Sequence, residues 1–312
     1  MNTHPATPET IAKGARILRA GGLVAFPTET VYGLGADATQ PDAVARIFEA
    51  KGRPTFNPLI VHLGSADWIT EIANPDDRFH KLAQAFWPGP LSLVLKQANG
   101  SPIAQLATAG LESIAVRCPM GVIANALLNA SGRPLAAPSA NRSGAISPTH
   151  ADHVAESLGN KVDLILDGGP CSIGLESTVL DLTTAEAVIL RPGAITPEQI
   201  NAVIGAVTMA ASTEHTPKSP GQMLSHYAPT LPLRLNATTV APREAYLGFG
   251  PTAGATLNLS EGGDLSEAAT NLFAMLRSLD DPRRFIAIAA APVPETGLGI
   301  AINDRLRRAA FQ

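Results

Sequence analysis

The stretch Lys51-Gly-Arg-Pro-Thr-Phe-Asn-Pro-Leu-Ile-Val-His62 contains the end of a predicted helix, a turn and the start of a predicted strand. The helix covers residues 41–51, whose apolar side chains fall on one face, and the strand covers the apolar run 59–63. Gly52 and Pro54 keep the intervening residues out of the helix. A helix that leads through a turn into a buried strand is typical of an α/β sheet domain.

The same mixture of elements extends outward from this stretch and predicts an α/β sheet domain over residues 1–207. Further helices are predicted at residues 10–20, at residues 150–158 and around Leu127. Apolar runs predict further strands at residues 23–26, 91–95, 114–117, 135–138, 164–166, 177–182 and 187–190.

The chain changes character after residue 207. Residues 208–230 are polar and punctuated by Pro and Gly, which indicates a linker. Strand-like runs then resume around a helix predicted at residues 265–279. Residues 231–312 are therefore predicted to form a small second α/β domain.

Composition places the 312-residue chain among compact globular proteins, because 45% of its residues are hydrophobic and only 16% are charged. No run of about 18 apolar residues predicts a membrane span, and the first residues lack the features of a secretory signal. Cys118 and Cys171 have no metal-binding spacing and fit either buried thiols or a single bridge. We therefore expect a cytoplasmic protein without a disulfide framework.

The distribution of charge argues against nucleic-acid binding as the main role. Residues 1–207 carry 14 Lys and Arg against 18 Asp and Glu, and residues 208–312 carry 9 of each kind. Proteins that bind phosphate backbones usually have a basic excess or a basic face. We therefore expect no strong direct binding of nucleic acid.

Standard nucleotide and hydrolase motifs are incomplete. Gly169-Pro-Cys-Ser-Ile-Gly174 has the glycine spacing of a P-loop, but Leu175-Glu176 stands where Lys-Ser/Thr is required. Gly33-Leu-Gly35 begins too far beyond the preceding strand for a dinucleotide loop, and we interpret both segments as turns that need small residues. The absence of a Gly-x-Ser-x-Gly elbow and of a His-Glu-x-x-His pair disfavours a serine hydrolase and a zinc enzyme.

Polar side chains gather instead in non-helical segments rich in small residues, at 26–35, 51–62, 138–148 and 174–179. Hydroxyl and amide groups on such loops at strand ends are how open sheets bind small polar ligands. Four cations lie in or beside these segments and roughly match the charge of a triphosphate: Lys51, Arg53, Arg117 and Arg191. Considered alone, the Lys51–Arg53 pair fits both a solvated basic turn and an anion site.

Together these segments resemble the threonylcarbamoyl-AMP synthases, a family that shares the YrdC-like domain. The resemblance covers nearly the whole chain and extends to the longer, two-domain branch of the family. The matching segments are Phe26-Pro-Thr-Glu-Thr-Val-Tyr-Gly-Leu-Gly35, Lys51-x-Arg53-x-x-x-Asn57-Pro-Leu59, Trp87-Pro-Gly-Pro90, Ala115-Val-Arg117-x-Pro119, Pro138-Ser-Ala-Asn141, Arg191-Pro-Gly193, Ser219-Pro-Gly221, Ser225-His-Tyr-Ala-Pro229 and residues 297–310.

The resemblance implies an open twisted mixed sheet of the YrdC-like type, followed by a linker and a small second α/β domain. It implies an L-threonylcarbamoyladenylate synthase, a nucleotidyltransferase that forms threonylcarbamoyl-AMP and pyrophosphate from L-threonine, bicarbonate and ATP. Mg²⁺ is expected with ATP, without an identified protein ligand. Other proteins would then transfer the threonylcarbamoyl group to tRNA, giving threonylcarbamoyladenosine.

Position by position, the resemblance assigns L-threonine to Thr30, His62, Arg117 and Ser177. It assigns ATP to Arg53, Asn57, Ser113, Ser139, Asn141, Ser147, Arg191 and Tyr227. Lys51 and Arg53 are carried over as the catalytic cations, and residues 208–230 as a lid over the active site. The family often has a hydroxyl residue where this chain has Ala137, so we expect one threonine contact to be lost or to come from the backbone.

Other interpretations remain open from the sequence. Carbamoyl-transferring maturation proteins share the same domain, but they are much longer and carry zinc fingers, whereas this chain has no Cys-x-x-Cys pair. A non-catalytic module for double-stranded RNA is the second alternative, and the acidic balance speaks against it. His62 also fits a half-buried strand residue, and Lys51 a cation at a helix C-terminus.

Overall fold

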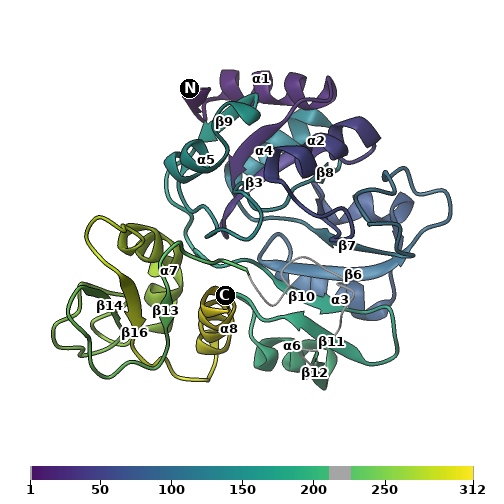
Figure 1. Cartoon of the computed structure of the whole chain (residues 1–312). Coiled ribbons are helices and arrows are strands. Elements are labelled where there is room, and N and C mark those ends of the chain that lie inside the picture. The colour runs from purple at the N-terminus through teal and green to yellow at the C-terminus, as the bar shows by residue number, and fades with distance from the viewer. Residues whose placement is uncertain (1, 211–225, 312) are drawn as a thin grey trace.

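The computed structural model describes residues 2–210 and 226–311. Within these residues the chain forms a larger unit around a twelve-stranded mixed sheet and a smaller unit around a four-stranded parallel sheet. Figure 1 shows the larger unit in purple to green and the smaller unit, which contains the C-terminus, in green to yellow. The predicted fold class, a mixed α/β sheet with a second small α/β unit, is confirmed.

The helices and strands of both units have the following bounds. The helices of the larger unit are α1 (Pro8–Arg19), α2 (Pro41–Lys51), η1 (Ala66–Glu71), α3 (Asp77–Phe86), α4 (Val122–Ser131), α5 (Ala151–Leu158), η2 (Gly159–Lys161) and α6 (Pro197–Ile204). Its strands are β1 (Thr3–Pro5), β2 (Val24–Pro27), β3 (Tyr32–Asp37), β4 (Ile60–His62), β5 (Ala73–Asn74), β6 (Leu91–Gln97), β7 (Ser113–Arg117), β8 (Leu135–Ala136), β9 (Leu164–Asp167), β10 (Thr178–Asp181), β11 (Ala187–Arg191) and β12 (Val207–Met209). The smaller unit contains β13 (Leu233–Arg234), β14 (Glu244–Gly248), β15 (Leu257–Asn258), α7 (Leu265–Leu279), β16 (Ala287–Ala290) and α8 (Leu298–Ala310).

The large sheet has the strand order β1-β9-β2-β3-β8-β4-β7-β6-β10-β11-β12, with β5 paired to β6. Its pairs are mixed, since β4 runs parallel to β7 while β6 runs antiparallel to β7. The register of β4 and β7 sets His62 opposite Arg117, at the carboxyl ends of both strands. Parallel pairing thus brings together two site residues that are far apart in sequence.

Helix α2 ends where the sequence predicts. Gly52 follows the last helical residue in the left-handed conformation, with φ +59°, which glycine adopts without a steric penalty. Lys51 is the last residue of the helix and is buried. The turn then directs the chain back into β4, so the helix end and the strand that carries His62 are held close to each other.

The interpretation of Gly33 and Gly35 as turn residues is wrong, because both lie inside strand β3. A Cβ atom on Gly35 would come within 2.8 Å of the Phe26 ring on the paired strand β2. Gly35 is therefore needed for close packing of a fully buried strand against an aromatic ring, whereas a Cβ atom on Gly33 would meet its neighbours only at ordinary contact distances of 3.5 Å and more.

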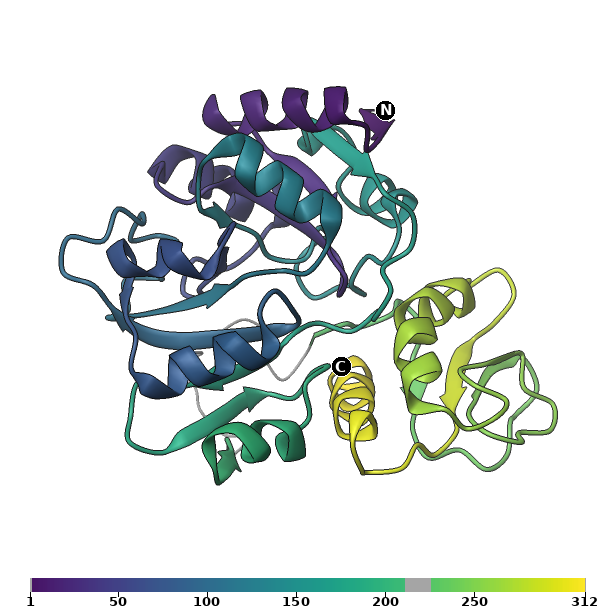
Figure 2. The same ribbon diagram turned by 180° about the vertical axis from the view of Figure 1, so that it is seen from behind.

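The smaller unit packs against the larger one through a shared core. Tyr227, Phe273 and Leu272 of the smaller unit cluster with Val31 and Leu175 of the larger unit. In both ribbon views α8 lies between the rest of the smaller unit and the larger unit (Figures 1 and 2). The two units are therefore joined by buried contacts rather than only by chain connectivity.

A glycine makes one of the contacts between the units possible. Gly174 has φ +75°, and a Cβ atom there would lie 2.6 Å from the Cα atom of Thr270 on α7. The loop before β10 thus approaches the backbone of α7 more closely than any side chain would allow.

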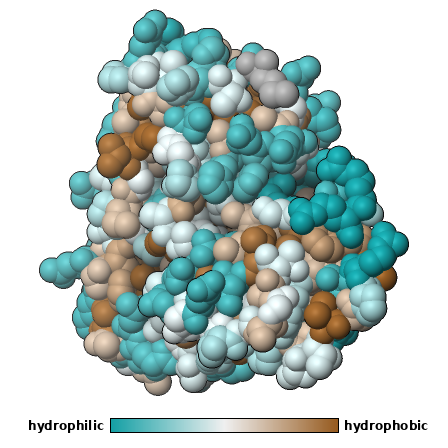
Figure 3. Space-filling model, turned by 90° about the vertical axis from the view of Figure 1, so that its left-hand side faces the viewer, coloured by the Kyte–Doolittle hydropathy of each residue, from teal (hydrophilic) through white to brown (hydrophobic). Residues whose placement is uncertain are grey.

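The surface is consistent with the composition. The face in Figure 3 mixes hydrophilic areas with small, separated hydrophobic ones. Across residues 2–210 and 226–311, no helix combines the length and hydropathy that a membrane span requires.

Gly193, in the turn after β11, also packs against backbone. A Cβ atom on Gly193 would lie 2.3 Å from the amide nitrogen of Thr178 and 2.5 Å from the carbonyl oxygen of Glu176. Both neighbours are backbone atoms, which have little freedom to move. The turn after β11 therefore packs directly against the start of β10.

We predict that Gly193→Ala lowers the free energy of unfolding by about 1–3 kcal/mol, because the added methyl group overpacks the turn. Gly262→Ala is the matched control, since a Cβ atom at Gly262 meets nothing within 4 Å and should change stability by less than about 0.5 kcal/mol. Urea unfolding of both variants measures the difference. Equal stability of the two variants would contradict the packing described for Gly193.

Candidate active site

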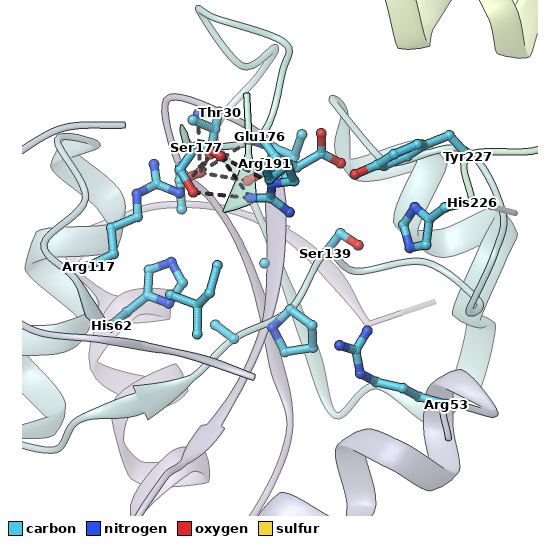
Figure 4. Close-up of a pocket in the computed structure, with 16 residues that line it drawn as sticks. Thr30, Arg53, His62, Arg117, Ser139, Glu176, Ser177, Arg191, His226 and Tyr227 are labelled. Atoms are coloured by element: carbon cyan, nitrogen blue, oxygen red, sulfur yellow. Dashed lines mark hydrogen bonds between the residues drawn. The ribbon is translucent and has the colours of Figure 1, made fainter. Parts of the chain in front are cut away.

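A cavity of about 50 Å³ lies where strand ends of the larger sheet meet His226 and Tyr227. Figure 4 shows the labelled side chains around this space. The residues that line it are Thr28, Thr30, Val31, Gly33, Arg53, Ile60, His62, Arg117, Ala137, Pro138, Ser139, Glu176, Ser177, Arg191, His226 and Tyr227. Three of the four cations highlighted by the sequence are among them.

Arg117 ends β7 and is held on three sides. Its Nε donates to the carbonyl oxygen of Gly89 at 3.1 Å, and its two terminal nitrogens donate to Thr30 Oγ1 at 3.0 Å and to Glu29 Oε1 at 2.6 Å. The other oxygen of Glu29 accepts a hydrogen bond from the amide of Met120. The guanidinium group is therefore fixed in orientation before any ligand binds.

Glu29 is the partner of Arg117 that the sequence analysis did not identify. Its buried ion pair with Arg117 balances the charge of that guanidinium group. The available signal was its place between Thr28 and Thr30, inside a polar segment that follows a buried strand.

His62 and Thr30 lie beside Arg117. Burial, reinforced by the charge of Arg117, lowers the pKa of His62 to about 3, so its imidazole is neutral near pH 7. The ring stands edge-on to Phe26, and its Nδ1 has no hydrogen-bond partner among the described residues. A neutral imidazole with an unused nitrogen at a cavity wall is suited to hydrogen bonding with a ligand.

Ser177 and Arg191 form the middle of the site. Ser177 Oγ lies 2.7 Å from Ser92 Oγ and accepts a hydrogen bond from Arg191 at 3.2 Å. Arg191 also donates twice to the carbonyl oxygen of Ser177. Burial lowers the pKa of Arg191, but its usual value is high enough for the group to stay charged near pH 7.

Arg53 occupies the opposite side of the cavity from Arg117 (Figure 4). It donates to the carbonyl oxygens of Asn57 at 3.1 Å and Pro58 at 2.9 Å, which closes the turn between α2 and β4. Burial, with the nearby charge of Arg191, lowers its pKa to about 10. Arg53 thus remains a cation near pH 7 and shapes its own loop.

Lys51 lies behind the cavity wall rather than in it. Its ammonium group donates to the carbonyl oxygens of Ser139 and Asn141, each at 2.6 Å, and burial lowers its pKa well below the usual value. The structure therefore shows Lys51 binding the backbone of the Ser-x-Asn segment. This contact places Ser139 at the cavity.

Three further residues assigned to ATP, Asn57, Asn141 and Ser147, are not among the residues that line the cavity. Asn141 donates to the carbonyl oxygens of Arg142 and Ala145, and its Oδ1 has no hydrogen-bond partner in the described part of the chain. Ser147 donates to Glu176 Oε1 at 2.5 Å. Asn141 and Ser147 support the loop that follows β8.

Ser113 is not among the residues that line this cavity. Ser113 begins β7 and Arg117 ends it, so the two are separated by roughly 13 Å of extended strand. Ser113 instead lines a separate open groove together with Lys96 and Glu112.

Glu176 is a second residue of the site that the sequence analysis did not identify. It is buried at the cavity wall, and its oxygens accept hydrogen bonds from Ser147 and from Arg305 of α8. The charges of Arg305 and Arg191 lower the pKa of this carboxyl to about 2 although burial opposes them, so it is ionised near pH 7. Arg305 is 129 residues away, and no local pattern indicates this pairing.

His226 and Tyr227 close one side of the cavity. Tyr227 is fully buried, stacks on Phe273 and lies under the guanidinium group of Arg305. Its hydroxyl oxygen has no hydrogen-bond partner within residues 2–210 and 226–311. Residues 211–225 of the predicted lid lie outside the described residues, as do Ser219-Pro-Gly221 and Ser225.

Comparison with known proteins gives matches to both units. The family described as "Telomere recombination" matches residues 16–193, and the family described as "Threonylcarbamoyl-AMP synthase, C-terminal domain" matches residues 195–311. A Bacillus subtilis protein named threonylcarbamoyl-AMP synthase is 42% identical, with 96% of this chain and 92% of the relative covered. A Pyrococcus abyssi protein of the same name is also 42% identical, with 95% and 92% covered.

A solved structure is similar over the whole length. The crystal structure of P. abyssi Sua5 complexed with L-threonine matches with a TM-score of 0.91 at 40% identity, covering 99% of this chain and 96% of that one. The similarity therefore includes the smaller unit, which distinguishes this chain from proteins that share only the YrdC-like domain. The chain belongs to the threonylcarbamoyl-AMP synthases of the Sua5 type, nucleotidyltransferases in which a YrdC-like domain is followed by a Sua5 C-terminal domain.

Proposed function

We propose that the synthase binds L-threonine beside Arg117 and the phosphates of ATP beside Arg53 and Arg191. The observation that carries this assignment is the convergence of three buried guanidinium groups on one cavity with hydroxyl groups in its walls. Figure 4 places Arg117 and His62 on one side, Arg53 on the other, and Arg191 with Ser177 between them. The two substrates would then meet near Ser177.

At the threonine end, Arg117 would bind the amino acid's carboxylate. The hydrogen bonds to Gly89, Thr30 and Glu29 leave each terminal nitrogen with a second N–H that can point at a ligand. Thr30, His62 and Ser177 offer hydroxyl and imidazole groups for threonine's amine and side chain. The P. abyssi structure with L-threonine supports a threonine site in this fold.

At the nucleotide end, Arg53 and Arg191 would neutralise phosphate charge. Ser139 would add a hydroxyl group to the phosphate site, and Lys51 would act by holding the loop that carries it. Asn57, Asn141 and Ser147 would support the same loops. Ser113, which the resemblance also assigns to ATP, lies at the other end of β7 from Arg117 and does not line this cavity.

The proposed reaction joins L-threonine, bicarbonate and ATP. Threonine's amine forms a carbamate with bicarbonate and releases water, a carbamate oxygen then attacks the α-phosphorus of ATP, and the bond to the leaving pyrophosphate breaks. Such a phosphoryl transfer needs positioning and positive charge more than a covalent nucleophile. The buried arginines meet that demand, since their charges are fixed before the substrates arrive.

Mg²⁺ would enter with ATP and neutralise part of the phosphate charge. The carboxylate in the cavity wall, Glu176, already accepts hydrogen bonds from Ser147 and Arg305. This arrangement fits a metal held by the phosphates better than one held by the protein.

The segment that carries Tyr227 would act as a lid. A cavity of about 50 Å³ holds only a few water molecules, so this closed arrangement has to open for ATP. We propose that residues 208–230 form the linker between a catalytic domain, residues 1–207, and the C-terminal domain, residues 231–312. Movement of the linker would displace His226 and Tyr227 from the cavity.

The product is a reactive mixed anhydride that has to reach another protein. We propose that this cytoplasmic enzyme passes threonylcarbamoyl-AMP to proteins that modify tRNA to threonylcarbamoyladenosine. The acidic first 207 residues argue against strong direct binding of tRNA by this chain.

We predict that Arg117→Lys raises the KM for threonine roughly 10- to 100-fold, because lysine keeps the charge but loses the planar fork that pairs with a carboxylate. The KM for ATP should change less than about threefold. Pyrophosphate release measured against each substrate tests this, with Arg133→Lys as a control at a largely exposed arginine. An unchanged KM for threonine would refute the assignment.

We predict that Tyr227→Phe leaves the unliganded protein as stable or more stable, since it removes a buried hydroxyl group without a partner among the described residues. Its kcat/KM for ATP should fall about fivefold or more if the hydroxyl group bonds the nucleotide. Tyr246→Phe is the control, because that hydroxyl donates to Ala237 and its loss should lower stability without affecting kinetics. Unchanged kinetics in Tyr227→Phe would contradict a contact with ATP.

We predict that stability falls as the pH drops from about 6.5 toward 3. His62 and His226, each with its pKa lowered to about 3, and His153, with its pKa lowered to about 4, stay neutral in the folded protein while they are protonated in the unfolded one. His62 and His226 each contribute stability above pH 6.5 that is lost at about 1.4 kcal/mol per pH unit as the pH falls toward 3. His153 acts in the same direction down to about pH 4 but contributes less, because it is partly exposed and solvent screens its charge.

In His62→Gln, the number of protons taken up on unfolding in this pH range should fall by about one. The free energy of unfolding measured in urea at pH 7 and at pH 5 gives this number. His80→Gln, a change at an exposed histidine, serves as the control and should retain the slope of the unchanged protein. A slope in His62→Gln equal to that control would show that His62 is not held neutral.

A further inference from the structure

Arg305 is a buried cation from outside the larger unit. It lies in the middle of α8 and is fully buried. Its Nε donates to Glu176 Oε2 at 2.9 Å, and one terminal nitrogen donates to the carbonyl oxygen of Pro192 at 2.9 Å and to Asp304 Oδ2 at 2.7 Å. Three of its neighbours, Glu176, Tyr227 and the turn after β11, belong to the cavity wall or adjoin it.

Arg305 does not itself line the cavity. It acts on the cavity through Glu176, whose two oxygens are bonded to Ser147 and to Arg305. Arg191 is close enough to Glu176 for its charge also to stabilise the ionised carboxylate. Arg191 of the larger unit and Arg305 of the smaller unit therefore both stabilise the negative charge of the same buried carboxylate, Glu176.

The cost of burying charge suggests that the ion pair of Glu176 and Arg305 has a role other than stabilising the fold. Taking a carboxylate and a guanidinium group out of water costs several kcal/mol per ion, so a buried ion pair is weak evidence for stability alone. Removing only Arg305 would leave Glu176 as a buried anion beside Arg191 and the space assigned to phosphates. That anion would attract Arg191 and repel a triphosphate.

We propose that Arg305 is a positioning residue of the nucleotide site: it neutralises Glu176, so that Arg191 keeps its orientation on Ser177 and its charge toward the ATP phosphates. This role rests on the proposed assignment of Arg191 to ATP. It gives the C-terminal domain a direct part in nucleotide binding, through one side chain of its last helix. The bond between Arg305 and the Pro192 carbonyl also fixes the turn that follows Arg191.

The test is steady-state kinetics of pyrophosphate release by the full chain. Arg305→Met should raise the KM for ATP at least tenfold and change the KM for threonine less than threefold. Adding Glu176→Gln to Arg305→Met should bring the KM for ATP back to within about threefold of the unchanged protein, because it removes the uncompensated anion. If Arg305 had a purely structural role, Arg305→Met would raise the KM for ATP and the KM for threonine together, and adding Glu176→Gln would not restore them.

Arg307→Met is the matched control on the same helix, because Arg307 forms an exposed ion pair with Glu295 and should leave both KM values unchanged. If Arg305→Met does not fold, Arg305→Gln takes its place, with the same expected rise in the KM for ATP and the same small change in the KM for threonine. An unchanged KM for ATP, a parallel rise in both KM values, or no recovery in the double variant would overturn the proposal.

Arg191→Met separates this proposal from the one on which it rests. A raised KM for ATP in Arg191→Met, with a normal one in Arg305→Met, would refute only the positioning role. A normal KM for ATP in Arg191→Met would overturn the assignment of Arg191 to ATP, and the role of Arg305 with it.

Discussion

The structure depends on how buried positive charge is compensated before any substrate is present. Lys51, Arg53 and Arg191 each donate to backbone carbonyl oxygens of the loops that form the cavity. Arg117 and Arg305 bind carbonyl oxygens too, and each also pairs with a buried carboxylate. Carbonyl groups offset part of the desolvation cost without removing the charge, so the site keeps a positive field for anionic substrates.

Part of the site could be predicted from sequence because local signals mark it. The residue pair Lys51 and Arg53 was visible, because Gly52 and Pro54 mark a turn around them. The apolar runs predicted the two strands that end in His62 and Arg117, but that these strands pair in parallel is seen only in the structure. The family resemblance then supplied roles that spacing alone does not reveal.

The remaining parts could not be predicted because they depend on long-range packing. Glu176 looked like a failed P-loop position until the fold set it against Arg305, 129 residues away. Gly33 and Gly35 resembled a turn because the sequence does not show that they pair with Phe26 and Val24 of the neighbouring strand β2. That Ser113 does not line the cavity could not be predicted either, because the assignment did not include the length of β7, which separates Ser113 from Arg117.

Tyr227 belongs at once to the wall of the cavity and to the hydrophobic core of the smaller unit. The proposed withdrawal of Tyr227 to admit a nucleotide would take its aromatic ring out of the stack with Phe273. Opening would then be a partial local unfolding, with a free energy set by the packing of the smaller unit. Apparent nucleotide affinity should accordingly follow the opening equilibrium, so substitutions in a distant core can tune substrate binding without touching the substrate.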